Sequence, residues 1–210
     1  MGALIEHLTT SEAAVAAGVT VPQVQRIIDE KILPNDLYST AQMRTFRTDA
    51  CVLIAFYFET AESLTASARL RAIRNALVHC RAWDSWKNCT FEEHSVTVRF
   101  FDIWKGVDDR LHQLAKAREA VVEDPGILSG TPVFKGTRVP VYDIAAMVEA
   151  DVSVKEILET YPSLKGWQVK LASIYARAVP PKGRPKRTPS NIPAGKSYIK
   201  KRLRPSSIGG

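Results

Sequence analysis

The chain has 210 residues, of which 45% are hydrophobic and 24% charged, with a formal net charge of +7, as in an ordinary globular protein of one or two domains. Its longest apolar run, residues 50–58, is far too short for a bilayer, which needs about 20 residues, and the first seven residues lack the pattern of a signal peptide. We therefore expect a cytoplasmic protein without membrane contact, whose three cysteines, which form no C-x-x-C motif, are reduced.

The first predicted element is a short helix, Ser11–Ala17. It follows a capping box, in which the Thr9 side chain and the Glu12 side chain each satisfy a backbone N–H of the other residue. Gly18 comes directly after the helix and can supply the sharp turn of a helix-turn-helix.

A second capping box, Thr20 with Gln23, starts a helix that is expected to end near Asp29. Gln23 and Arg26 lie off its apolar face, beside the exposed start of the helix. The two segments together look like the helix-turn-helix of small DNA-binding regulators, including the MerR-like kind. We predict DNA contact through Thr20, Gln23 and Arg26, and a purely structural helical hairpin remains the alternative.

The middle of the chain is predicted to be mainly helical. Hydrophobic periodicity indicates a long helical region followed by a second helix, and the alternation between them indicates a half-buried strand. The expected elements are a short wing or connector at Tyr38–Phe46, helix over residues 49–82 with a break near 63–65, a strand at 95–103, and a helix from Asp102 or Lys105 to Ala120.

The most distinctive stretch is residues 130–141, which read Gly-Thr-Pro-Val-Phe-Lys-Gly-Thr-Arg-Val-Pro-Val. It predicts a hairpin of two edge strands, Pro132–Lys135 and Thr137–Val141, because proline cannot donate a ladder hydrogen bond. Gly136 is expected to supply the positive φ of the turn. Further helices are expected at Tyr142–Glu149, Val154–Tyr161 and Trp167–Ala178.

Residues 122–164 resemble the antitoxin-like helix-turn-helix domains of prokaryotic type II toxin–antitoxin systems. The match rests on the stretch just quoted, on Asp124-Pro125-Gly126 before it, and on Glu156-Ile157-Leu158 and Tyr161-Pro162-Ser163-Leu164 after it. The resemblance implies a VapB-type antitoxin, not an enzyme, whose partner is a PIN-type endoribonuclease usually encoded beside it. Such antitoxins generally bind their own operator DNA as dimers and cover the toxin with a C-terminal segment.

This layout gives a mainly α fold in three parts. Residues 1–90 are expected to form a DNA-binding domain with the MerR-like helix-turn-helix. Residues 91–178 are expected to form the antitoxin-like helix-turn-helix and dimerisation domain, with short hairpin strands. Residues 179–210 are the tail.

The two predicted helix-turn-helix units differ in charge. The second has five acidic residues against one cation, namely Asp143, Glu149, Asp151, Glu156 and Glu159 against Lys155. Phosphate contacts supply most non-specific affinity for DNA, and an acidic helix repels phosphate. We therefore predict that the first unit reads DNA and that the second is a scaffold for dimer or partner contacts.

The tail holds the excess positive charge. Residues 181–210 contain nine cations and no acid, whereas the rest of the chain has 20 Lys and Arg against 22 Asp and Glu. Its prolines disfavour packed structure, so we expect disorder in isolation. The resemblance implies a toxin whose carboxylate cluster holds Mg²⁺, and a cationic tail could pair with those carboxylates. The predicted toxin-binding residues are Arg184, Arg187, Tyr198, Ile199, Arg202, Leu203 and Arg204.

The same tail also fits a different class of protein, a stand-alone helix-turn-helix transcription regulator whose basic arm contacts DNA. The sequence contains no convincing catalytic or metal site. His79, Cys80, Cys89 and His94 lack the regular spacing of a structural zinc site. We therefore expect no enzyme activity, no cofactor and no metal.

Overall fold

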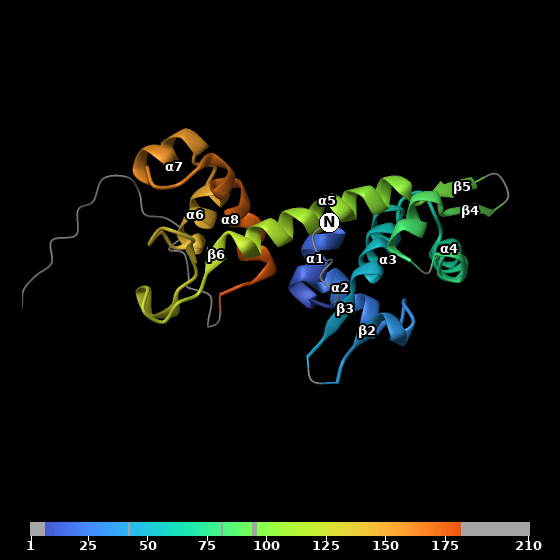
Figure 1. Ribbon diagram of the computed structural model, residues 1–210. Helices are drawn as coiled ribbons and strands as arrows, with labels where there is room; N and C mark the ends of the chain where they lie inside the picture. Colours follow the sequence, from blue (N-terminus) through green and yellow to red (C-terminus); the bar gives the residue numbers. More distant parts are fainter. Residues whose placement is uncertain (1–6, 42, 81, 94–95, 182–210) are drawn as a thin grey trace, which may run out of the picture.

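The computed structural model describes residues 7–181 except positions 42, 81 and 94–95. The fold is mainly helical with three small antiparallel sheets in this part of the chain (Figure 1). Helix α5, Phe101–Glu119, crosses the molecule, with the N-terminal elements along one half and the C-terminal elements at the other end (Figure 1). The mainly α fold class predicted from the sequence is confirmed.

The N-terminal elements are two short helices and a three-stranded sheet. They are β1 (His7–Thr9), α1 (Thr10–Ala17), α2 (Val21–Asp29), the 3-10 turn η1 (Asn35–Leu37), β2 (Tyr38–Ser39) and β3 (Thr45–Arg47). The strand order is β1-β3-β2, and Phe46 of β3 lies opposite both Leu8 and Tyr38. The segment predicted as a wing or connector is therefore a hairpin, and β1 completes its sheet.

The predicted helical region over residues 49–82 is two helices, α3 (Thr48–Glu59) and α4 (Ala66–His79). The predicted break near residues 63–65 is confirmed, because those residues lie between the two helices. A 3-10 turn, η2 (Trp83–Asn88), leads into a second antiparallel pair, β4 (Thr90–Glu93) and β5 (Val96–Arg99).

The strand predicted over residues 95–103 is too long, because β5 ends at Arg99 and α5 begins at Phe101. Phe100 is fully buried, with its ring 4.8 Å from that of Phe56 and 5.6 Å from that of Trp86. The alternating apolar pattern of the strand thus runs directly into the first turn of a helix, where Ile103 and Trp104 are buried.

The expectation of reduced cysteines is wrong for two of the three. Cys80 and Cys89 form a disulfide with their Cα atoms 6.5 Å apart. The intervening turn η2 folds back and brings the two residues together although nine positions separate them. Cys51 is a buried free thiol in the first turn of α3, and burial raises its pKa well above the ordinary value.

The predicted hairpin around Gly136 is present but short, with backbone hydrogen bonds from Phe134 N–H to Val139 O and from Val141 N–H to Pro132 O, and a further strand joins it. β6 (Val121–Val122) pairs with β7 (Val133–Phe134), and Val133 forms a bridge with Pro140 on the other side. β7 is therefore the middle of this arrangement, and the predicted strand Thr137–Val141 is reduced to that bridge. Its shortening follows from the start of the next helix at Val141. Gly136 has φ +77°, so the predicted positive-φ turn is confirmed.

Three helices complete the described fold. They are α6 (Val141–Glu149), α7 (Val154–Thr160) and α8 (Gly166–Ala178), preceded by the 3-10 turn η3 (Leu128–Gly130). Each lies within one residue of its predicted bounds. The buried side chain of Gln168 caps the start of α8, because its Oε1 accepts the Lys165 backbone N–H at 2.8 Å.

The described residues form two hydrophobic cores that meet inside α5. The first takes in buried residues from Leu8 to Leu114 together with Ala178, and the second runs from Ala117 to Tyr175. The predicted domain division at residue 90 is not where the cores meet, since the first half of α5 is buried with the N-terminal elements. None of the helices in the described part of the chain is long and apolar enough to cross a membrane.

Candidate nucleic-acid interface and its connection to the second core

The corner between α1 and α2 is built from strong local signals. The Thr9 Oγ1 accepts the Glu12 backbone N–H, and the Glu12 carboxylate accepts the Thr9 backbone N–H at 2.9 Å. α1 ends at Gly18 in the left-handed conformation, with φ +72° and ψ +28°. A residue with a Cβ is strained there, so glycine fixes the position of the turn. The first predicted capping box and the predicted turn are confirmed.

The second capping box holds two of the residues predicted to contact DNA. The Gln23 Oε1 accepts hydrogen bonds from the backbone N–H and the hydroxyl of Thr20, at 2.8 and 2.9 Å. These bonds use the carbonyl end of the Gln23 amide and leave its NH₂ end for another acceptor. Thr20 is exposed and Gln23 is half-buried. The first turn of α2 is thus both a helix cap and an exposed polar surface.

Arg26, the third predicted DNA contact, lies one turn further along α2. Its Nε donates to Glu30 Oε1 at 2.7 Å, and both side chains are about half exposed. The hydrogen bond from Arg26 to Glu30 raises the pKa of Arg26, so the guanidinium stays charged. Exposed ion pairs of this kind exchange partners readily because solvent screens them. A phosphate could therefore displace Glu30.

The hairpin of β2 and β3 projects beside α2 (Figure 1). The loop before β3 carries Met43, whose side chain is 64% exposed, and the exposed Arg44. Arg47, at the end of β3, makes two hydrogen bonds to the Asp49 carboxylate, at 3.1 and 2.8 Å. This hairpin adds a second exposed surface that carries the cations Arg44 and Arg47.

The turn after α1 is held by an arginine from the centre of α5. The Arg110 Nε donates to Ala16 O at 2.8 Å, and its Nη2 donates to Ala17 O at 3.2 Å. The last carbonyls of a helix lack partners and carry partial negative charge, so a guanidinium there both caps and stabilises the helix. A Cβ built on Gly18 would lie 3.0 Å from the Arg110 Cζ. The φ value therefore favours glycine, and any other residue would also make the Arg110 guanidinium shift by a few tenths of an ångström.

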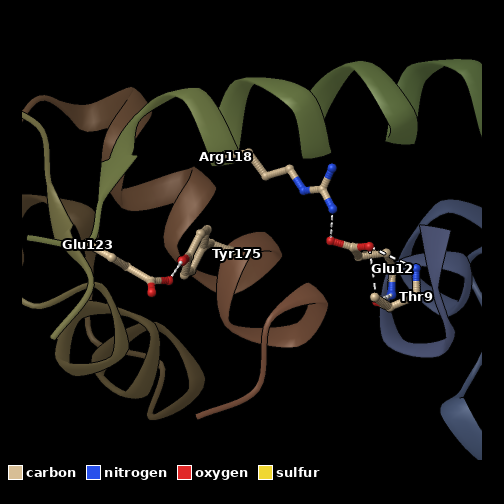
Figure 2. Close-up of polar contacts among 5 residues, drawn as sticks. All are labelled: Thr9, Glu12, Arg118, Glu123 and Tyr175. Atoms are coloured by element: carbon tan, nitrogen blue, oxygen red, sulfur yellow. Dashed lines mark hydrogen bonds and ion pairs between the residues drawn. The ribbon is translucent and has the colours of Figure 1, made fainter. Parts of the chain in front are cut away.

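A second arginine of α5 holds the start of α1. Arg118 donates to the Glu12 carboxylate, which is buried and also accepts from Thr9 (Figure 2). Arg118 lies two turns beyond Arg110, so one face of α5 grips both ends of α1. The orientation of α1 is therefore fixed relative to the end of α5 that enters the second core.

The second core is joined internally by two tyrosines of its helices. The Tyr175 hydroxyl donates to Glu123 Oε1 at 2.9 Å (Figure 2), and the Tyr142 hydroxyl donates to Val179 O at 2.8 Å. Burial, and then the bond to Glu123, raises the pKa of Tyr175 above its ordinary value. Burial also raises the pKa of Tyr142. Both hydroxyls thus stay protonated at neutral pH and act as donors.

The acidic residues of the second core gather on α6, α7 and the turn between them. The five acids identified in the sequence and Lys155 are all exposed, and Lys155 reaches Glu159 at 3.9 Å. Glu156 closes the capping box of α7 through Ser153, whose hydrogen bonds lower the pKa of the Glu156 carboxyl. This surface keeps its negative charge at neutral pH.

Two comparisons with known proteins cover different parts of the chain. Residues 121–176 match the family described as "Protein of unknown function (DUF433)". A protein described as "Uncharacterized protein y4eO", from Sinorhizobium fredii (strain NBRC 101917 / NGR234), is 44% identical over 209 residues, which is 96% of this chain and 94% of that protein. The chain belongs to the y4eO family. No solved structure matches it.

The DUF433 segment begins at β6 and ends in α8, which is nearly the extent of the second core. The similarity to y4eO covers both cores, so the α1–α2 corner and the DUF433 segment occur together in that relative's aligned length. The predicted toxin-binding residues, all at position 184 or beyond, lie outside the described residues.

The sequence did not lead us to expect the contacts of Arg110 and Arg118, the two arginines of α5 that hold α1. Both contacts span more than ninety positions, and no local pattern reports them. Their spacing along α5 gives the one available signal, because residues eight apart lie on the same face of a helix. This spacing indicates that both arginines lie on one face of α5, but it does not indicate that this face contacts α1.

Proposed function

We propose that this protein is the VapB-type antitoxin of a type II toxin–antitoxin system. In this account α1, the turn at Gly18 and α2 form a MerR-like helix-turn-helix with the β2–β3 hairpin as its wing, and a homodimer binds the operator of its own genes. The partner is a PIN-type endoribonuclease, and the basic tail from residue 182 onward neutralises it.

The DNA-binding part of the proposal rests on the start of α2. Thr20 is exposed there, and the reciprocal capping box of Thr20 and Gln23 holds both polar side chains in place. A recognition helix enters the major groove with its N-terminal residues at the base edges. Gln23 keeps its amide NH₂ free of the cap, and this group can donate to acceptors on a base edge. Arg26 and the wing residue Arg44 are exposed cations that can contact phosphates.

The partner-binding part is supported by how charge is distributed in the DUF433 segment. The acidic surface of α6 and α7 repels a phosphate backbone, so this segment is a poor second DNA reader. The grip of α5 on α1 gives a physical route by which a partner on this segment could affect DNA binding, since α1 cannot tilt independently of α5.

A substitution at Gln23 can separate its role in the helix cap from its proposed contact with a base. Gln23→Glu keeps an oxygen acceptor for Thr20 and places a negative charge at a helix N-terminus, where it is tolerated, so the fold should be preserved. The same charge repels DNA and removes the amide donor. We expect Gln23→Glu, and the double variant Gln23→Ala/Arg26→Ala, to lose at least about tenfold in affinity for the upstream operator region in a mobility-shift assay.

A matched control removes one amide and one arginine from elsewhere. Asn75→Ala/Arg99→Ala changes exposed residues on α4 and β5, at the far end of the molecule from the DUF433 segment (Figure 1). This variant should bind the operator like the wild type. Operator affinity unchanged in Gln23→Glu would remove α2 as the reading helix and favour the structural hairpin.

A further inference from the structure

A broad groove lies beside the DUF433 segment, between the second half of α5, the turn at Lys135–Thr137 and the first half of α8. Its volume is about 1120 Å³, enough for several side chains of another chain. Part of its lining is apolar, from the half-buried Ile174 and from Ala120 and Leu171, which are largely buried in the second core. Trp167 also lines the groove, and its side chain is 50% exposed. A half-exposed tryptophan on an apolar lining is typical of a contact surface.

Four lysines surround this lining, namely Lys116, Lys135, Lys165 and Lys170, against a single acid, Glu119. All four lysines are exposed. They come from three segments that are distant in the sequence, so the positive rim is a product of the fold. The opposite charge gathers on α6 and α7 of the same unit, which makes the unit strongly bipolar.

We propose that this groove is the docking site for an acidic, partly apolar segment of a partner protein. Carboxylates of the segment would pair with the lysine rim, and its apolar side chains would cover Trp167 and the accessible part of Ile174. The inference rests on the proposed function only in taking the toxin as that partner. It adds a contact surface on the DUF433 segment to the contact proposed for the tail.

Three other occupants fit less well. The chain's own tail is excluded by sign, because residues 181–210 carry nine cations and no acid. Nucleic acid would satisfy the lysines and its bases could stack on Trp167, but it would leave the half-buried Ile174 without an apolar partner and would meet the acidic helices nearby. A second copy could offer its acidic α6–α7 surface, and a head-to-tail contact of that kind forms open chains unless it closes into a ring.

The first experiment uses Trp167 as a local reporter in the full chain. Of the four tryptophans, Trp86 and Trp104 are buried and Trp83 is half-buried, so acrylamide quenching reports mainly on Trp167. The probe is a synthetic peptide of alternating glutamate and leucine pairs. We expect this peptide to protect Trp167 from acrylamide, and Trp167→Phe to remove the protected signal.

Charge variants then locate the site. Lys135→Glu/Lys170→Glu should weaken binding of the peptide at least about tenfold. The control Lys105→Glu/Lys155→Glu makes the same change of charge at exposed lysines outside the groove, and should leave binding unchanged. Because the tail is present in every variant, its own attraction for the peptide cancels from the comparison.

The remaining outcomes contradict the inference in distinct ways. Protection by a single-stranded oligonucleotide in place of the peptide would assign the groove to nucleic acid. A loss of self-association in Lys135→Glu/Lys170→Glu on sedimentation would assign it to a second copy. No protection by the acidic peptide, or equal protection when lysine replaces its glutamates, would contradict the docking site.

If the neighbouring gene's product fails to bind the wild-type chain, the proposed function fails. The peptide titration still decides whether the groove binds an acidic segment.

Discussion

The Glu12 carboxylate is buried beneath α5 and receives the Arg118 guanidinium from 106 positions along the chain (Figure 2). The same carboxylate closes the capping box of α1 through Thr9. One side chain therefore starts the helix that positions α2 and also ties that helix to the end of α5, just before the DUF433 segment. The pair thus links the first core to the part of α5 where the second core begins.

Removing the arginine should leave a buried charge without its partner. We expect Arg118→Ala to lower the free energy of unfolding by about 2–3 kcal/mol, below the full cost for a buried pair because Arg118 itself is partly exposed. Adding Glu12→Gln, which keeps an acceptor for Thr9 and removes the charge, should restore more than half of that loss. Chemical denaturation measures both variants. The control Arg99→Ala, on exposed β5, should change stability by less than about 0.5 kcal/mol.

If Arg118→Ala costs nothing, the pair does not hold the two cores together. An equal loss in the single and double variants would mean that Arg118 acts through packing and not through the Glu12 charge.

Two glycines with positive φ should differ in how they respond to alanine. Gly18 and Gly136 have φ +72° and +77°, so a side chain at either costs about 1 kcal/mol from the backbone alone. Around Gly136 no atom lies within 4 Å of a new Cβ, whereas at Gly18 the Cβ would press on the Arg110 guanidinium. We expect Gly18→Ala to cost up to about 1 kcal/mol more than Gly136→Ala, because Arg110 must shift by a few tenths of an ångström, which weakens its bonds to the end of α1.

Thermal or chemical melts of the two variants decide the point. Equal losses would mean that the Arg110 contact with the turn contributes nothing, and no loss in Gly136→Ala would place the turn after β7 elsewhere.

The sequence was most informative where structure is set by neighbouring residues. The boxes of Thr9 with Glu12 and of Thr20 with Gln23 act over three positions, so they locate the starts of α1 and α2 without knowledge of the rest of the chain. Gly136 likewise predicts the position of its turn from a single residue. The apolar periodicity of α3 to α8 gave helix positions for the same reason.

Features made by distant contacts could not be predicted in this way. The partner of β3 includes β1, which is nearly forty positions away, and its three residues are too few for a strand pattern. The Cys80–Cys89 pair depends on the fold of η2 between them, and C-x-x-C reasoning overlooks a spacing of nine. The lysine rim around Trp167 joins three segments whose individual charges are unremarkable in the sequence.

A count of reactive thiols tests the disulfide directly. Without reductant, the unfolded chain should present one thiol, that of Cys51, and after reduction it should present three. In the native state Cys51 should react with neither thiol reagent nor oxidant at pH 8, because burial blocks access and raises its pKa, and the thiolate is the reactive form. Three reactive thiols before reduction would restore the original expectation of reduced cysteines.

The tyrosine pair of the second core should make stability fall in alkali. Because the pKa of Tyr175 is raised in the fold, the folded chain keeps a proton that the unfolded chain releases above pH of about 10. Its contribution is therefore complete below that pH and decreases as pH rises further. Tyr175→Phe should lose about 1 kcal/mol at neutral pH, with the bond to Glu123, and should show a smaller decline above pH 10. An unchanged alkaline slope in this variant would mean that Tyr175 titrates alike in both states.

The account's central claim is tested most directly by growth rescue in cells that express the neighbouring gene's product. Three forms are compared: the wild type, Gln23→Ala/Arg26→Ala, and a chain ending at residue 181. We predict that the wild type and the double variant restore growth, and that the shortened chain shifts operator DNA but does not restore growth. Failure of the wild type to restore growth would contradict the assignment as an antitoxin. Rescue by the shortened chain, with weaker DNA binding and a flatter dependence on salt, would show that the tail is a DNA-binding arm.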